Sequence, residues 1–185
     1  MIRRVATGHD AGGKSIVASD AAVDAVRLDL LPGYAWHRLW PEDKSAEFFP
    51  PPGDHRFLVF EVPPDTTVRP PVPPGTSLYA ELERALPGMA PRMERDGMHA
   101  SESIDYGYIA SGEVWLELDD GRSVRLRAGD TYVQRGTRHA WRNKSAASCT
   151  IVVVLIGISA RRPRRPSRPR SARAPGIRSR NRRRG

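Results

Sequence analysis

The feature that most constrains the fold is a series of short alternating segments between residues 98 and 157. Residues 113–118 alternate Glu or Trp with Val or Leu, and residues 124–127 alternate Val or Leu with Arg, so each segment has one apolar and one polar face. Asp120-Gly121 lies between the two segments and predicts a hairpin turn, because both residues accept a positive φ. Short strands at this spacing predict an antiparallel sandwich or barrel.

Other parts of the chain also have the patterns of strands or of a helix. Three short strands are expected in the N-terminal part, at residues 3–7, 15–19 and 34–40. Further strands are expected at residues 56–62, 104–110, 131–134, 139–143 and 149–156. Ser77 is followed by apolar residues at helical spacing and then by Pro87-Gly88, which predicts one short helix. The predicted fold class is therefore all-β with a short helix.

Composition divides the chain into three expected parts: an N-terminal extension at 1–52, a β-barrel domain at 53–159 and a tail at 160–185. The tail is rich in Arg and Pro and poor in aliphatic side chains, so we expect it to be disordered. It holds 12 of the 30 basic residues and no acidic residue, which leaves 18 basic against 21 acidic residues elsewhere, a net charge of −3. Nucleic acid is therefore expected to bind at most nonspecifically, through the tail.

The chain has a single cysteine, Cys149, which excludes an internal disulfide and is typical of a reducing compartment. Because Cys149 lies beside an apolar stretch, we interpret it as a buried thiol. The longest apolar run, residues 151–158, is far shorter than the roughly 20 residues that span a bilayer. We therefore expect a cytoplasmic protein that does not insert into a membrane.

Two motifs in the patterned segment resemble those of the cupin superfamily. The first cupin motif maps onto His99, Ser101, Asp105 and Gly112, and the second onto Gly129, Gln134, Gly136, His139 and Asn143. The chain is similar to small single-domain microbial cupins of the type-2 kind. The resemblance implies a double-stranded β-helix, also called a jelly-roll barrel, over residues 53–159, and it implies a homodimer. It does not by itself specify a reaction, because one fold supports many chemistries.

The resemblance also implies a metal site made by two His and one Glu of the first motif and one His of the second. This chain keeps His99 and His139, has Ser101 in place of the other His, and has Asp105 in place of the Glu. On an unbroken strand His99 and Asp105 share a face. Two imidazoles and one carboxylate suit Fe, Mn, Ni or Zn, whereas Glu102 is a rival carboxylate on the opposite face. The alternative is a metal-free pocket with hydrogen-bonded histidines.

Polar and aromatic side chains near these positions are candidates for the wall of a pocket. They are Ser101, Tyr106, Tyr108, Gln134 and Trp141. Ser101 would hold a metal-bound water, Gln134 would contact the metal or the substrate, and the aromatic rings would take an apolar or aromatic ligand. For each ring, a place in the barrel core or in a dimer contact is the alternative.

Two functions from different classes follow. The first is a metal-dependent enzyme acting on a small organic or aromatic metabolite, as a decarboxylase, isomerase, cyclase or dioxygenase. The second is a metal-independent cupin that binds a small molecule, or serves as an accessory protein, without catalysis. The Ser at position 101 favours the second, and the two histidines at motif positions favour the first.

Overall fold

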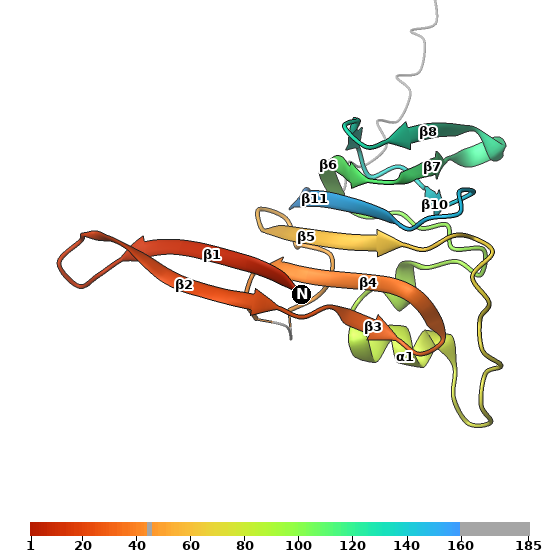
Figure 1. Cartoon of the computed structure of the whole chain (residues 1–185), viewed down its shortest axis with the longest axis horizontal. Helices are drawn as coiled ribbons and strands as arrows, with labels where there is room; N and C mark the ends of the chain where they lie inside the picture. The colour runs from red at the N-terminus through yellow and green to blue at the C-terminus, as the bar shows by residue number, and fades with distance from the viewer. Residues whose placement is uncertain (44–45, 160–185) are drawn as a thin grey trace, which may run out of the picture.

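The computed structural model describes residues 1–43 and 46–159, and the expected disorder of the tail lies outside these residues. The described part is mostly β with one short α-helix (Figure 1). A six-stranded sheet has the order β3-β4-β5-β11-β6-β9, a three-stranded sheet has the order β10-β7-β8, and β1 and β2 form a hairpin. The strands are β1 Ile2–His9, β2 Ser15–Val23, β3 Val26–Leu28, β4 Leu31–Trp40, β5 His55–Val62, β6 Ser103–Ser111, β7 Glu113–Glu117, β8 Ser123–Arg127, β9 Thr131–Gln134, β10 Ala140–Arg142 and β11 Cys149–Gly157.

Strand β11 is the centre of the larger sheet, where it pairs antiparallel with both β5 and β6. Its sequence is a run of Ile, Val and Leu, which suits a strand that is covered along both edges. The side chains of Ile151, Val153 and Leu155 are buried, while Ile156 on the other face is exposed. One face of this sheet therefore points into the core, and the other lies outside it.

The hairpin expected at Asp120-Gly121 is present between β7 and β8. Asp120 has a φ of 59° and Gly121 a φ of 68°, so both residues adopt the left-handed conformation that the turn requires. Val114 pairs with Leu126 across the two strands, and both side chains are buried. They pack with Ile109 and Ile151 of the larger sheet, so this cluster joins the two sheets.

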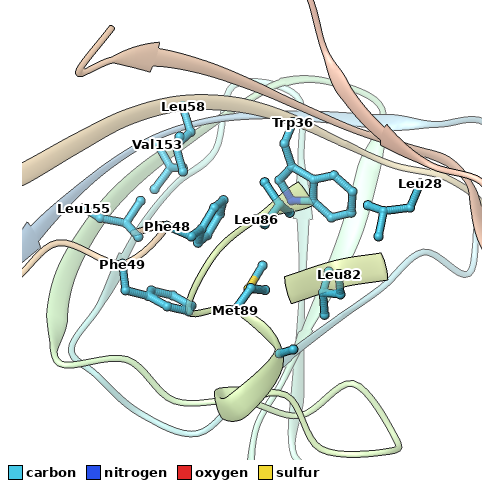
Figure 2. Packing of buried hydrophobic residues seen from close by; sticks show 11 residues of the cluster. Leu28, Trp36, Phe48, Phe49, Leu58, Leu82, Leu86, Met89, Val153 and Leu155 are labelled. Carbon is cyan, nitrogen blue, oxygen red and sulfur yellow. The ribbon is translucent and has the colours of Figure 1, made fainter. Parts of the chain in front are cut away.

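The helix α1, Leu78–Ala85, begins at Ser77 as predicted. The Ser77 Oγ accepts a hydrogen bond from the Ala80 backbone nitrogen at 3.0 Å, which satisfies one of the free amide groups of the first turn. Leu82 is its buried side chain. Figure 2 shows Leu82 and Leu86 facing Trp36 of β4, so the helix covers part of the inner face of the larger sheet.

The strands expected at residues 3–7, 15–19 and 34–40 lie within β1, β2 and β4. Strand β4 pairs with β5, so the larger sheet extends across residue 52 without a break between extension and domain. The β1–β2 hairpin instead projects away from the two larger sheets (Figure 1). Only its base, at Ile2 and Val23, packs on Leu39 and Val59.

The single cysteine, Cys149, is packed inside the protein. Cys149 is buried, and burial raises the pKa of its thiol to about 11, which keeps the thiol protonated at neutral pH. The structure supports the interpretation of Cys149 as a packed side chain.

Over residues 1–43 and 46–159, no helix has the length and apolar character needed to cross a membrane.

Candidate functional site

A cavity of about 210 Å³ lies on the inner face of the larger sheet, beside α1 and the loop that follows it. Its wall is mainly aromatic and aliphatic. Figure 2 shows part of this wall, where Trp36, Leu58 and Val153 face Leu82 and Met89. The polar side chains of His99, Asp105 and His139 also line this cavity, as do charged residues that include Arg69, Glu94 and Arg142. An apolar cavity with a few convergent polar groups is the usual form of a small-molecule site.

His99 and His139 are brought side by side by a short antiparallel bridge. The backbone nitrogen of His99 donates to the carbonyl oxygen of His139 at 2.8 Å, and the reverse bond is 2.9 Å. The two ring centroids are 4.3 Å apart. The sequence placed these residues 40 positions apart, in two separate motifs, and the structure makes them direct neighbours.

Each imidazole is oriented by a bond to the backbone two residues before it. The His99 Nδ1 lies 3.2 Å from the Gly97 carbonyl oxygen, and the His139 Nδ1 lies 2.9 Å from that of Thr137. Because a carbonyl oxygen only accepts hydrogen bonds, each Nδ1 carries the hydrogen and donates it. The Nε2 atom of each ring is therefore the basic nitrogen, with its lone pair available.

Burial keeps both imidazoles neutral. Desolvation, together with repulsion from the neighbouring His99 ring when both would be protonated, lowers the pKa of His139 to about 4. Desolvation likewise lowers the pKa of His99. Two rings in such close contact tolerate each other because neither is charged at neutral pH.

Asp105 lies on β6 and its side chain is only 7% exposed. Burial raises the pKa of its carboxyl to about 6, although the Ser103 hydroxyl opposes this by donating to Oδ1 at 2.5 Å. Ser101 and Ser103 hydroxyls are 2.8 Å apart, so Ser101 belongs to a buried hydrogen-bonded row that ends on Asp105. A carboxyl with a pKa near 6 can exchange a proton close to neutral pH.

Trp141 of β10 lines the cavity, and its ring packs edge-on against those of Tyr132 and His139. Tyr106 and Tyr108 do not line it. Their side chains are 51% and 46% exposed on the outer face of β6, because side chains on a strand alternate and Asp105 points inward. The prediction that these two tyrosines line the pocket is wrong. Dimer contact is the alternative interpretation that remains for them, and the homodimer stays a prediction.

Gln134 and Asn143 are buried and act on loops. The Gln134 Nε2 donates to the Thr137 carbonyl oxygen at 3.0 Å, within the loop that carries His139, and Gln134 is not part of the cavity wall. The Asn143 Nδ2 donates to the carbonyl oxygens of Val62 and Ala147. Glu102 is exposed, so the rival carboxylate lies outside the cavity.

The sequence of residues 88–155, which carry this histidine pair, matches the Cupin_2 family, described as a cupin domain. This chain contains a cupin domain. The mostly β structure with one short helix agrees with this assignment. The matched segment contains both predicted motifs, from His99 to Asn143, so the predicted resemblance to cupins is confirmed.

Sequence relatives of this cupin occur in fungi. Phomopsin biosynthesis cluster protein C' of Diaporthe leptostromiformis is 48% identical over 73 residues, which is 40% of this chain and 38% of the relative. The cupin-domain-containing oxidoreductase virC of Hypocrea virens is 48% identical over 46 residues, which is 25% of this chain and 24% of the relative. The chain thus spans between a quarter and two fifths of the length of these relatives. Among solved structures, the cupin domain of Schizosaccharomyces pombe Cnp3 has a TM-score of 0.46 at 10% identity, covering 84% of this chain and 87% of that one.

Cupins often bind a metal, which raises the question of whether the side chains of this cavity fit as metal ligands. His99 and His139 fit as two ligands, since each ring keeps a basic Nε2 and lines the cavity. Across residues 1–43 and 46–159, however, no three or more His, Cys, Asp or Glu side chains are grouped so that they would hold a metal ion. Asp105 lines the same cavity but is bonded to Ser103. The side chains as arranged therefore do not make up a complete three-ligand centre, and metal binding by this cupin stays a prediction.

Several residues of the cavity wall were not singled out from the sequence. Phe48 and Phe49 precede a run of prolines, and Phe60 lies on β5. Tyr132 pairs across the sheet with Gly107, and its ring lies where a side chain at position 107 would stand. The glycine in the middle of a strand was the available signal, because such a glycine often marks a close approach.

Proposed function

We propose that this cupin domain is an enzyme of small-molecule metabolism that acts on an apolar, ring-bearing metabolite bound in the cavity. The observation that carries the proposal is the arrangement of the cavity wall. Aromatic and aliphatic side chains form most of it, and two neutral imidazoles and one buried carboxyl lie among them, with charged residues elsewhere on the wall. The apolar part would bind a ring by burial and by edge contacts, and the polar part would face its reactive atoms.

The polar residues have distinct roles in this proposal. The Nε2 atoms of His99 and His139 accept a proton or a hydrogen bond from the ligand, because each Nδ1 is already committed to the backbone. Burial raises the pKa of the Asp105 carboxyl to about 6, so this group takes up and releases a proton near neutral pH. The apolar wall excludes water and strengthens these polar contacts. Proton transfer at the ligand is the chemistry that this chain's own side chains support.

The relatives support a role in biosynthesis. One is described as a protein of a phomopsin biosynthesis cluster and another as a cupin-domain-containing oxidoreductase. By similarity, we propose that this cupin also serves the biosynthesis of a small metabolite. Because the matches cover only part of each relative, the reaction class of those proteins does not transfer as a whole.

The proposal is tested with a neutral fluorescent probe, N-phenyl-1-naphthylamine, and a matched pair of substitutions. Val153 is buried in the cavity wall, whereas Val133 is 58% exposed on the outer face. Val153→Phe fills the cavity and is expected to lower probe affinity at least tenfold, or about 1.4 kcal/mol. Val133→Phe is expected to leave the affinity unchanged. Titration of probe fluorescence measures both, and near-ultraviolet circular dichroism checks the fold. If wild-type protein fails to bind the probe, or both variants bind it equally, the cavity is not the ligand site.

A metal-dependent form of the enzyme is the second candidate. Both histidines present a basic Nε2 on adjacent rings, and this observation favours the metal-dependent form. Each ring is oriented by a hydrogen bond from Nδ1 to the backbone, as is common for histidines that bind a metal. In this case Fe, Mn, Ni or Zn would be held by His99 and His139, with Asp105 as the expected third ligand. A bound metal would supply Lewis-acid polarisation of a ligand oxygen.

Elemental analysis tests this second candidate on protein purified without an affinity tag or added metal. We expect about one equivalent of metal per chain in the wild type and its loss in His139→Ala, because a two-histidine site loses half of its imidazole donors. Glu102→Gln, on an exposed carboxylate outside the cavity, is the control and should keep the metal. Full occupancy in His139→Ala would show that other residues bind the metal. No metal after reconstitution would favour the metal-independent enzyme.

A further inference from the structure

The cavity that holds the histidines adjoins a second cavity of about 290 Å³. Leu31, Tyr34, Arg69, Trp141 and Arg142 line both, so the two spaces meet along these side chains. The inner cavity, at about 210 Å³, is smaller than the 300–1,000 Å³ that typically accommodates a drug-sized ligand. A ligand with more than one ring or with a polar substituent would therefore extend into the second cavity.

The two cavities differ in chemistry. The inner one is walled mainly by aromatic and aliphatic side chains, as described above. The second is walled by prolines and by polar or charged groups, among them Asp65, Thr67 and the two arginines. A ligand that occupies both would be apolar at one end and polar at the other.

Arg69 is the charged group of the second cavity whose donors are unused. Within the part of the chain that the structure describes, Arg69 makes no hydrogen bond and no ion pair, although a guanidinium has five N–H donors. Arg142 is engaged differently: its Nε donates to Glu117 at 2.6 Å and its Nη1 donates to the Asp96 carbonyl oxygen. The charges of Arg69, Arg142 and Asp65 all act on Tyr34, so these three groups lie near the tyrosine that lines both cavities.

The carboxylates of Glu94 and Asp119 are already bonded to an arginine other than Arg69. Glu94 accepts two hydrogen bonds from Arg138, and Asp119 accepts another from the same guanidinium. Asp65 accepts a bond from the backbone nitrogen of Asn143 at 2.9 Å. Of the two arginines that line both cavities, Arg69 is therefore the one that makes no hydrogen bond or ion pair within the described residues.

We infer that the ligand of this cupin is an aromatic acid, whose ring lies in the inner cavity and whose anionic group is bound by Arg69 in the second cavity. The inference rests on the proposed function and names its substrate class. A guanidinium pairs with a carboxylate or sulfonate through parallel N–H bonds, which adds direction as well as attraction. The shared wall of Tyr34 and Trp141 would then contact the ligand between its two ends.

Two related probes test the inference: 8-anilinonaphthalene-1-sulfonate, and N-phenyl-1-naphthylamine, which has the same rings without the anionic group. We expect the wild type to bind the sulfonate at least fivefold more tightly than the neutral probe. Arg69→Gln is expected to lower the affinity for the sulfonate about fivefold, the effect of a charged hydrogen bond weakened by partial exposure, and to leave the neutral probe unaffected. Arg69→Lys should restore part of the preference.

Arg122→Gln is the matched control, because Arg122 is exposed near the β7–β8 turn and lines neither cavity. Its affinities for both probes should equal those of the wild type. Equal binding of the two probes by the wild type, or equal loss of both in Arg69→Gln, would overturn the anionic subsite while leaving the proposed function standing. If neither probe binds, the proposed function fails and the inference fails with it. Added salt should lower the affinity for the sulfonate probe and leave that for the neutral probe unchanged.

Discussion

Gly107→Ala is expected to lower the free energy of unfolding by about 2 kcal/mol. The backbone at Gly107 does not have a positive φ, and a glycine inside a strand usually costs about 0.5–1 kcal/mol relative to alanine, so propensity alone predicts a more stable protein. Packing predicts the opposite. A Cβ at position 107 would overlap the ring of Tyr132, and overpacking a core typically costs about 1–3 kcal/mol. We expect the packing effect to win, because the Tyr132 ring is itself held against Trp141 at 5.0 Å.

A double-mutant cycle separates this strain from a general effect on the strand. In Tyr132→Ala the ring is absent, so a further Gly107→Ala change should cost nothing or add up to about 1 kcal/mol of stability. Urea denaturation of the four proteins measures the free energies. An equal cost of Gly107→Ala in both backgrounds would mean that the Tyr132 ring is not what opposes a side chain at this position. Gly107→Ala should also weaken binding of the neutral probe, because it displaces the Tyr132 ring that lines the cavity.

Asp105→Asn is expected to make the metal-free protein lose stability steeply between pH 6 and pH 4. In the wild type Asp105 acts in the opposite direction to the two buried histidines over this range. His139 has a pKa of about 4 when folded and 6.5 as a free side chain, so the unfolded chain takes up a proton first and stability falls as the pH drops. Asp105 has a pKa of about 6 when folded and 3.8 when free, so the folded chain takes up the proton first and stability rises as the pH drops.

The contributions of His139 and Asp105 are each about 3 kcal/mol over their ranges, at about 1.4 kcal/mol per pH unit, so these two nearly offset each other. The lowered pKa of His99 adds to the loss of stability at low pH. Asparagine removes the stabilising one and still accepts the hydrogen bond of Ser103. The difference in unfolding free energy between pH 6 and pH 4 should therefore grow by about 3 kcal/mol. His139→Gln provides the reciprocal comparison and should lose less stability toward pH 4 than the wild type, because only His99 then opposes Asp105. Guanidinium denaturation in the presence of EDTA measures all three proteins, and parallel pH profiles would show that neither group is buried as described.

Much of the fold could be predicted from local pattern. The β7–β8 hairpin follows from alternation and from two residues that accept positive φ, both of which are properties of a few neighbouring residues. The beginning of α1 at Ser77 is similarly local. The pairing of β4 with β5 was not predictable in this way, because proline-rich residues separate the two strands and pairing depends on contacts far apart in the chain.

The candidate site shows the same division. The two histidines were identified from motif spacing, and the structure brings them together. The error over Tyr106 and Tyr108 was avoidable, since residues 105 and 106 cannot share a face of a regular strand. Arg69 and Phe49 carry no pattern that distinguishes them, because they enter the cavity wall from loops whose paths are set by packing.

The sequence by itself determined the strand alternation, the turns and the cupin motifs, because each depends on residue types at short and regular spacing. Only the tertiary structure decided that Asp105 stays bonded to Ser103 instead of joining the histidines, and that Arg69 stands beside a second cavity. These outcomes depend on which side chains are buried next to one another. Burial sets the desolvation that shifts a pKa and the distance that permits a hydrogen bond, and neither quantity exists until the sheets have packed.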